Sequence, residues 1–164
     1  MNMPSPSTGT HHGRVPGFLP MSPADGLDQF HVTGTMAVRA MLRELQNARE
    51  HVVLYSADDD ALHLVTRVEG LEAQDFRLTM AGSEADIEAL MEAGPLTLVG
   101  MTGAVKIQLT VSALSLRDDG HTSQLIAAIP DHGWRIQRRD AFRVTPPEGD
   151  GATVVVRMPR QQEA

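Results

Sequence analysis

GAVKIQLTVSALSL, residues 103–116, is the longest run of alternating apolar and polar side chains in this sequence. In its first part every second residue is apolar, and this period of two is typical of an antiparallel strand with one buried face. The alternation changes phase from Leu114 onward, which predicts a bulge or a bend. Asp119-Gly120 predicts a two-residue hairpin turn, after which residues 121–129 form the return strand.

Shorter stretches before this run predict more strands. They carry the same alternation or a short apolar run, and each is bounded by turn residues: 51–56, 61–69, 76–80 and 95–102. The links between them are short, so neighbouring strands should pair antiparallel. About six short strands at regular spacing favour a small antiparallel β-barrel over a sandwich.

Two helices are predicted at the periphery of this barrel. In residues 35–47, apolar side chains recur at i, i+3, i+4 and i+7, with Thr33 or Thr35 as a cap; the stripe is Val38, Met41, Leu42 and Leu45. Residues 83–93 form the second helix, which Ser83 caps in a capping-box pattern. The fold class is therefore mainly β, with two peripheral helices.

Composition bounds the kind of protein. A chain of 164 residues with 41% hydrophobic residues has enough apolar material for one sizeable core. The absence of cysteine excludes disulfides, thiolate chemistry and Cys-ligated zinc, and is compatible with a reducing cytoplasm. A net charge of -7 argues against a general nucleic-acid binder. We expect neither a signal peptide nor a membrane-spanning segment.

The chain divides into an N-terminal tail, a folded domain and a charged linker. Residues 1–29 hold half of the ten prolines, mixed with Ser, Thr, Gly and His, so we expect a disordered tail. The strands and helices give a domain over residues 30–133. Residues 134–145 form the linker. The remaining residues, 146–164, contain one more predicted strand near Thr153.

Four arginines crowd the linker. The run Arg135-Ile136-Gln137-Arg138-Arg139-Asp140-Ala141-Phe142-Arg143 holds four of the fourteen basic residues of an acidic chain. Such close like charges repel one another unless an anion lies between them. A guanidinium can grip a phosphate with two parallel hydrogen bonds and can stack on a base. The plainer interpretation is that this protein uses arginine for every surface charge, since Lys106 is its only lysine.

Other candidate sites are weaker. His11-His12 could touch a metal, but an adjacent pair with no further ligand is typical of a solvated tail. Asp58-Asp59-Asp60 lacks the spacing of a calcium loop and is interpreted as a turn. His63 has no partner at a catalytic spacing and is interpreted as a strand-face residue. We expect no metal site and no catalytic residue.

The stretch that begins Gly103-Ala104-Val105-Lys106-Ile107-Gln108, together with Pro130 and the arginine run, resembles the YcgR-type flagellar brake proteins. The resemblance covers residues 30–147. In that family, an N-terminal β-barrel (the PilZN or YcgR domain, split-barrel-like) is followed by an arginine linker and a PilZ barrel that binds cyclic di-GMP. Residues 146–164 would then hold the first strand of a truncated PilZ domain.

The resemblance implies a function. Arg139 and Arg143 match the family's Arg-x-x-x-Arg and would bind cyclic di-GMP; Arg138, just before them, tends to accompany an intercalated ligand pair. The protein would be a non-enzymatic regulator without cofactors, with flagellar motor proteins of the stator or switch complex as partners. It would be cytoplasmic and would associate with the flagellum basal body.

One part of the family's pattern is missing. The PilZ half-site Asp/Asn-x-Ser-x-x-Gly occurs nowhere in this chain, so we expect a fragment or, failing that, a short degenerate paralogue. Two other functions remain open. One is a small-ligand module that binds flavin. The other is a single-stranded nucleic-acid module with Trp134 and Phe142 as stacking residues, although Trp134 is expected to anchor the linker on the barrel.

Overall fold

The computed structural model describes residues 15, 17–59, 61–137, 141–144 and 154–157; for the last two segments the backbone alone is described. Its elements, in chain order, are two short 3-10 helices, two α-helices and twelve strands: η1 Pro23–Asp25, η2 Leu27–Phe30, β1 His31–Thr33, α1 Thr35–Ala48, β2 Val52–Ser56, β3 His63–Thr66, β4 Val68–Leu71, β5 Asp75–Leu78, α2 Glu84–Glu92, β6 Leu96–Thr102, β7 Val105–Val111, β8 Leu114–Asp118, β9 Ser123–Ala128, β10 His132–Ile136, β11 Ala141–Val144 and β12 Val154–Arg157. The protein is mainly β with two helices, as predicted.

The strands form two main antiparallel sheets. One has six strands in the order β1-β10-β7-β6-β2-β3, and the other has four in the order β4-β5-β9-β8. Within the described residues the pairing ends at β1 and β3 in the first sheet and at β4 and β8 in the second, so a closed barrel is not confirmed. β11 and β12 pair only with each other in the described part of the chain.

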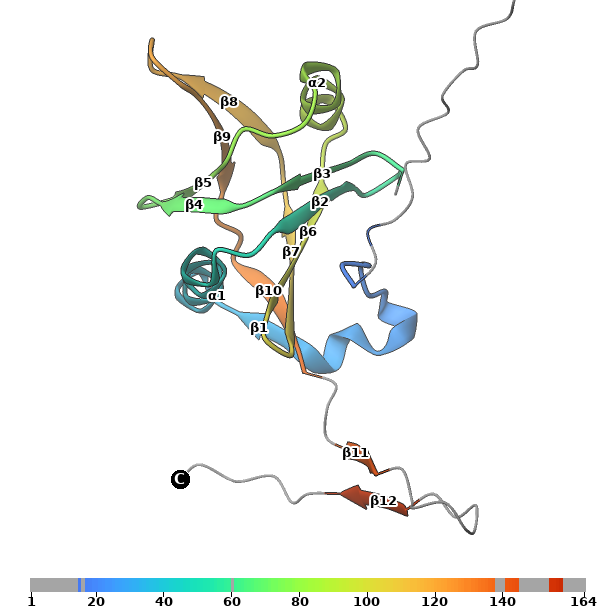
Figure 1. The fold of residues 1–164 in the computed structure, drawn as a ribbon. Coiled ribbons are helices and arrows are strands. Elements are labelled where there is room, and N and C mark those ends of the chain that lie inside the picture. The colour runs from blue at the N-terminus through green and yellow to red at the C-terminus, as the bar shows by residue number, and fades with distance from the viewer. Residues whose placement is uncertain (1–14, 16, 60, 138–140, 145–153, 158–164) are drawn as a thin grey trace, which may run out of the picture.

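The chain passes directly from one sheet to the other. The predicted strand 61–69 is wrong as a single element, because Thr66 pairs with Val52 in the six-stranded sheet and Val68 pairs with Leu78 in the four-stranded sheet. The phase change predicted near Leu114 is confirmed: β7 ends in one sheet and β8 begins in the other. Figure 1 shows both crossings, from β3 to β4 and from β7 to β8.

One hydrophobic core lies between the sheets and the helices. The predicted stripe of α1 is confirmed, since all four of its residues are buried: Val38, Met41, Leu42 and Leu45. Two glycines of the six-stranded sheet lie under this helix: a Cβ on Gly100 would collide with Leu45, and one on Gly133 would collide with Leu109 and crowd Met41. Helix α1 can therefore approach the sheet closely only because both side chains are missing.

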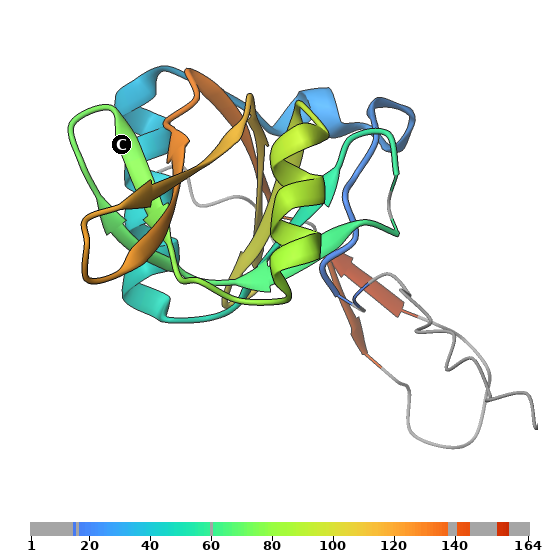
Figure 2. The ribbon, with the colours of Figure 1, turned by 90° about the horizontal axis from the view of Figure 1, so that it is seen from above.

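The ends of the helices show where local signals succeed. Ser83 caps α2, accepting a hydrogen bond from the backbone N–H of Asp86 at 3.1 Å, as predicted. At α1 the predicted threonine cap is wrong: the N-cap is Gly34 and no side chain caps the helix. Helix α2 lies against β3 and β8, and Figure 2 shows it from above.

The turn between β8 and β9 is longer than predicted. Asp118 pairs with Ser123, so residues 119–122 form a four-residue loop rather than a two-residue turn. The carboxylate of Asp119 fixes this loop, because it accepts hydrogen bonds from the backbone N–H groups of Thr122 at 2.8 Å and His121 at 2.9 Å. These bonds hold the pKa of the Asp119 carboxyl below its usual value.

The tail prediction is wrong for the described part of residues 1–29. Residues 17–30 lie across the face of the six-stranded sheet that points away from α1, which we call the outer face; Figure 1 draws this segment in blue. Met21 and Leu27 are buried there, because they contact Ile136 of β10. The predicted boundary after residue 133 also falls inside β10, so the folded domain includes Trp134 to Ile136.

Candidate functional site

The three predicted site residues follow β10 in the sequence. Arg138 and Arg139 are outside the described residues. Arg143 belongs to β11, where its backbone pairs with that of Val155. Only one of the three arginines is among the described residues, so their shared role stays a prediction. The structure does describe the strand in which the arginine run begins, β10.

Strand β10 is a central strand of the six-stranded sheet. It lies between β1 and β7, with Trp134 opposite Gln108 and Ile136 opposite Lys106. Ile136 is the last residue of β10, and it is buried. One further described residue, Gln137, precedes Arg138. The run therefore begins inside β10, at residues that pair with β7.

Arg135 differs from the other arginines of the run. Its Nη1 donates to both carboxylate oxygens of Glu44 on α1, at 2.8 and 2.7 Å. The charge is therefore already balanced inside the domain. A half-exposed ion pair of this kind contributes at most about 1 kcal/mol. Its main effect is to hold β10 against α1, and Arg135 is not a candidate for an outside anion.

Trp134 serves as an anchor, as predicted. It packs with the cluster of Met21, Leu27 and Ile136, and its ring lies 5.8 Å from that of His31 and 5.4 Å from that of His132. A ring already packed in this way is poorly placed to stack on a nucleotide base. The nucleic-acid alternative thereby loses one of its two stacking residues.

Gln108 is the polar residue that sequence reasoning missed. Its side chain is only 4% exposed, and its amide makes two hydrogen bonds to the backbone of Met21. Oε1 accepts from the Met21 N–H at 2.8 Å, and Nε2 donates to the Met21 carbonyl at 2.9 Å. Alternation placed Gln108 on the polar face of its strand, but no local signal showed that residues 17–30 cover that face.

A cavity of about 620 Å³ lies beside this contact. Residues 17–30, the β6–β7 hairpin and the end of β10 line it, among them Met21, Lys106 and Ile136. Lys106 Nζ donates to the carbonyl of Leu19 at 3.0 Å, so the lysine also ties residues 17–30 to β7. The end of β10 is therefore surrounded by the N-terminal segment and the hairpin.

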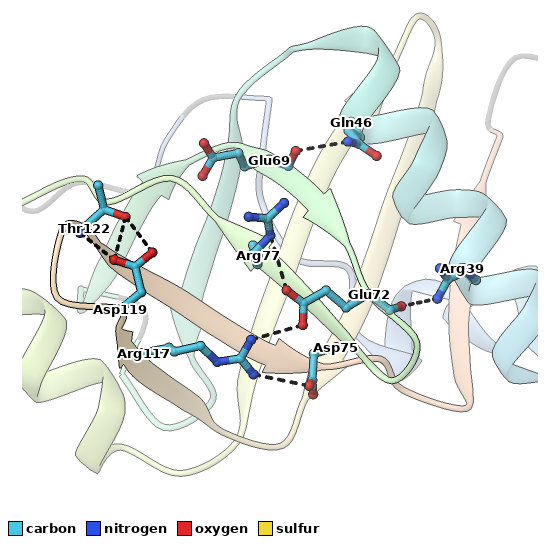
Figure 3. Close-up of polar contacts among 9 residues, drawn as sticks. All are labelled: Arg39, Gln46, Glu69, Glu72, Asp75, Arg77, Arg117, Asp119 and Thr122. Carbon is cyan, nitrogen blue, oxygen red and sulfur yellow. Dashed lines mark hydrogen bonds and ion pairs between the residues drawn. The ribbon is translucent and has the colours of Figure 1, made fainter.

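A second polar cluster joins α1 to the four-stranded sheet. Glu72 forms ion pairs with Arg117 at 3.1 Å and with Arg77 at 3.6 Å. Arg117 forms a second ion pair with Asp75 at 3.8 Å. Arg39 of α1 donates to the carbonyl of Glu72. Figure 3 shows these side chains turned toward one another. The charges find their partners within the cluster, which indicates a structural role.

The weaker candidates behave as predicted where they are described. Asp59 accepts a hydrogen bond from the backbone N–H of Ala61 at 2.9 Å, as in a turn, while Asp60 is outside the described residues, as are His11 and His12. His63 lies on β3, with its ring 5.9 Å from that of Tyr55. The described residues contain no group of three His, Asp or Glu side chains that could hold a metal ion. Among them, no helix has the length and apolar character that crossing a bilayer requires.

Comparisons with known proteins agree with one another. The family described as "Flagellar regulator YcgR, PilZN domain" matches residues 30–135. A flagellar brake protein YcgR from Leptothrix cholodnii is 29% identical over 131 residues, which are 78% of this chain and 52% of that protein. One from Erwinia tasmaniensis is 28% identical over 124 residues, 75% of this chain and 48% of the relative. The chain thus spans about half the length of these relatives.

Solved structures share the fold. The crystal structure of Escherichia coli YcgR in complex with c-di-GMP superposes with a TM-score of 0.63 at 24% identity, covering 73% of this chain and 52% of that one. The isolated YcgR-N domain from the same organism gives a TM-score of 0.60 at 21% identity and covers 68% of this chain and 98% of that one. The described fold is therefore that of the YcgR N-terminal domain.

Proposed function

The chain belongs to the YcgR family of flagellar regulators through its PilZN domain, and from that premise we propose that it is the N-terminal domain and linker of a cyclic di-GMP-responsive flagellar brake. The observation that carries the proposal is the place of the arginine run. Arg138 follows the buried end of β10 after a single residue. Ligand bound by the run would thus act directly on a strand of the domain.

Arg138, Arg139 and Arg143 supply the cationic half of the ligand site. Each guanidinium can form charge-assisted hydrogen bonds to a phosphodiester oxygen and can stack on guanine. The fourth arginine of the run, Arg135, is paired with Glu44 and takes no part. Binding of an anion offsets the repulsion among the remaining three and orders the linker, which is a sound physical basis for a switch.

The domain itself contacts the flagellar motor. The family is one of flagellar regulators, which supports regulation by binding. Stator or switch-complex proteins are the proposed partners, which places the protein in the cytoplasm at the flagellum basal body. The ligand-dependent linker would change how this domain is presented to the motor.

Calorimetric titration with cyclic di-GMP tests the arginine half-site. The titrated protein is a longer chain that carries these residues together with an Asp/Asn-x-Ser-x-x-Gly segment. Arg139→Ala and Arg143→Ala should each weaken binding by about tenfold or more, the cost of losing hydrogen bonds to a charged group. Arg117→Ala is the matched control: its partners lie within the domain, so affinity should stay unchanged. Unchanged affinity in both linker variants would overturn the assignment.

The 164-residue chain alone should bind cyclic di-GMP weakly. Its sequence contains no Asp/Asn-x-Ser-x-x-Gly, so the polar contacts that this half-site supplies are absent. The same calorimetric titration, run on this chain, checks the expectation. A sub-micromolar dissociation constant would show that the arginine half-site suffices on its own.

A further inference from the structure

The N-terminal segment is bound to the domain by side chains of the outer face. Phe18 packs on the cluster of Val53, Tyr55 and Val99, at one end of its path. Met21 and Leu27 pack on Ile136 at the other end. Between these two clusters, Gln108 and Lys106 of β7 hold the backbone of the segment. Residues 17–30 therefore cross the six-stranded sheet as a strap.

Gln108 makes the central contact of this strap. Its amide pairs with both backbone groups of one residue, as a neighbouring strand would, although no strand lies there. Loss of the amide would remove two hydrogen bonds between β7 and the backbone of Met21, each of which contributes about 0.5–1.5 kcal/mol. A single side chain thus contributes much of what keeps the strap in place.

Apart from its contacts with β7, the strap has little regular structure and few buried residues. Its secondary structure amounts to η1 and η2, which are three and four residues long. Only Met21 and Leu27 are buried, and Leu19 is 38% exposed. Segments with few buried contacts and little regular structure open at a lower free energy than the rest of a domain. The strap can therefore open while the core stays folded.

The strap and the arginine run share one contact residue. Ile136 packs with Met21 and Leu27 and is also the last residue of β10, two positions before Arg138. When the strap leaves, Ile136 loses the apolar cover of Met21 and Leu27, and the end of β10 keeps its pairing with β7 and the Arg135–Glu44 ion pair. The position of the strap therefore affects how firmly the arginine run is anchored.

From these contacts we propose that Gln108 is a positioning residue that docks residues 17–30 as a releasable strap and so fixes the start of the arginine run. The docked strap clamps Ile136, and the released strap frees it. By reciprocity, whatever holds the end of β10 in place also favours the docked strap. That cyclic di-GMP is such a factor rests on the proposed function, but the coupling between strap and strand does not.

Hydrogen exchange measured by mass spectrometry on the 164-residue chain, without ligand, tests the coupling. In Gln108→Leu, amides of the strap and of residues 132–137 should exchange about tenfold faster, as expected for an opening made easier by roughly 1.4 kcal/mol. Amides of β8 and β9 should keep their rates. Thr110→Val is the matched control: it lies two residues along β7 on the same face, is exposed, and should change neither segment.

A milder variant keeps the test valid if Gln108→Leu fails to fold. Ile136→Val removes one methylene from the shared contact and should speed strap exchange by a few-fold. Unchanged strap exchange in either variant overturns the proposal. So does faster exchange of the strap alone, because the two segments would then be uncoupled. An equal rise in every peptide, β8 and β9 included, would mean that Gln108 supports the whole domain rather than the strap.

Discussion

Leu42→Ala is expected to lower the free energy of unfolding by about 3 kcal/mol, the typical cost of emptying a buried leucine site. Leu42 is 0% exposed and lies in the stripe of α1 that faces the core. Leu42 packs in one core cluster with buried residues of both sheets, so the cavity left by the substitution cannot collapse unless the helix moves. Domains of this size are stable by only about 5–15 kcal/mol, so the loss would be a large share. Urea denaturation, followed by circular dichroism, measures it.

Met36→Ala is the matched control for Leu42→Ala. It shortens another long apolar side chain of the same helix, but Met36 is 79% exposed. Its effect should stay within about 0.5 kcal/mol of zero. Equal losses in the two variants would mean that the stripe of α1 does not face the core in solution.

Gly100→Val is expected to destabilise the domain by about 3 kcal/mol through overpacking. A Cβ at this position would stand 2.5 Å from Leu45 Cδ2 and 3.0 Å from Val52 Cγ1. Leu45 lies on the buried face of α1, so its side chain cannot swing aside, and the helix must lift from the sheet. A valine is ordinarily favoured in a strand, so the sign of the effect comes from packing alone.

Thr97→Val provides the comparison in the same strand. Thr97 lies on the outer face of β6, where its side chain is half-buried and a valine fits without meeting α1. Its denaturation midpoint should match that of the unaltered chain or exceed it slightly. If Gly100→Val were as stable as Thr97→Val, the close approach of α1 to the sheet would be refuted.

Local patterns predicted the helices and most strands of this domain. The stripe of α1 and the Ser83 cap were readable because both depend on residues within one or two turns. Sheet membership was not readable: alternation continues through Thr66 and Val68, although these two residues pair in different sheets. The alternation of apolar and polar residues shows which face of a strand is buried, but it does not identify the strand with which it pairs.

The anchorage of the candidate site was also beyond local patterns. The arginine run was recognised from its resemblance to a family, but the strand in which it begins depends on contacts between distant residues. Arg135 pairs with Glu44 across 91 positions, and Gln108 binds Met21 across 87. The proline-rich composition of residues 1–29 predicted disorder, because it gave no sign of the apolar outer face that Met21 and Leu27 cover.

The position of β10 in the sheet also determines when parts of the domain can fold during synthesis. β1 pairs with β10, which is inserted between β1 and β7, so about 100 residues separate the two partners in sequence. Until residue 136 has left the ribosome, neither β1 nor Ile136's contacts with Met21 and Leu27 can form. The pairing of β1 and the contacts of Met21 and Leu27 with Ile136 are therefore completed late in synthesis. A nascent chain stalled before β10 would expose an unpaired sheet edge and be open to misassembly with its neighbours.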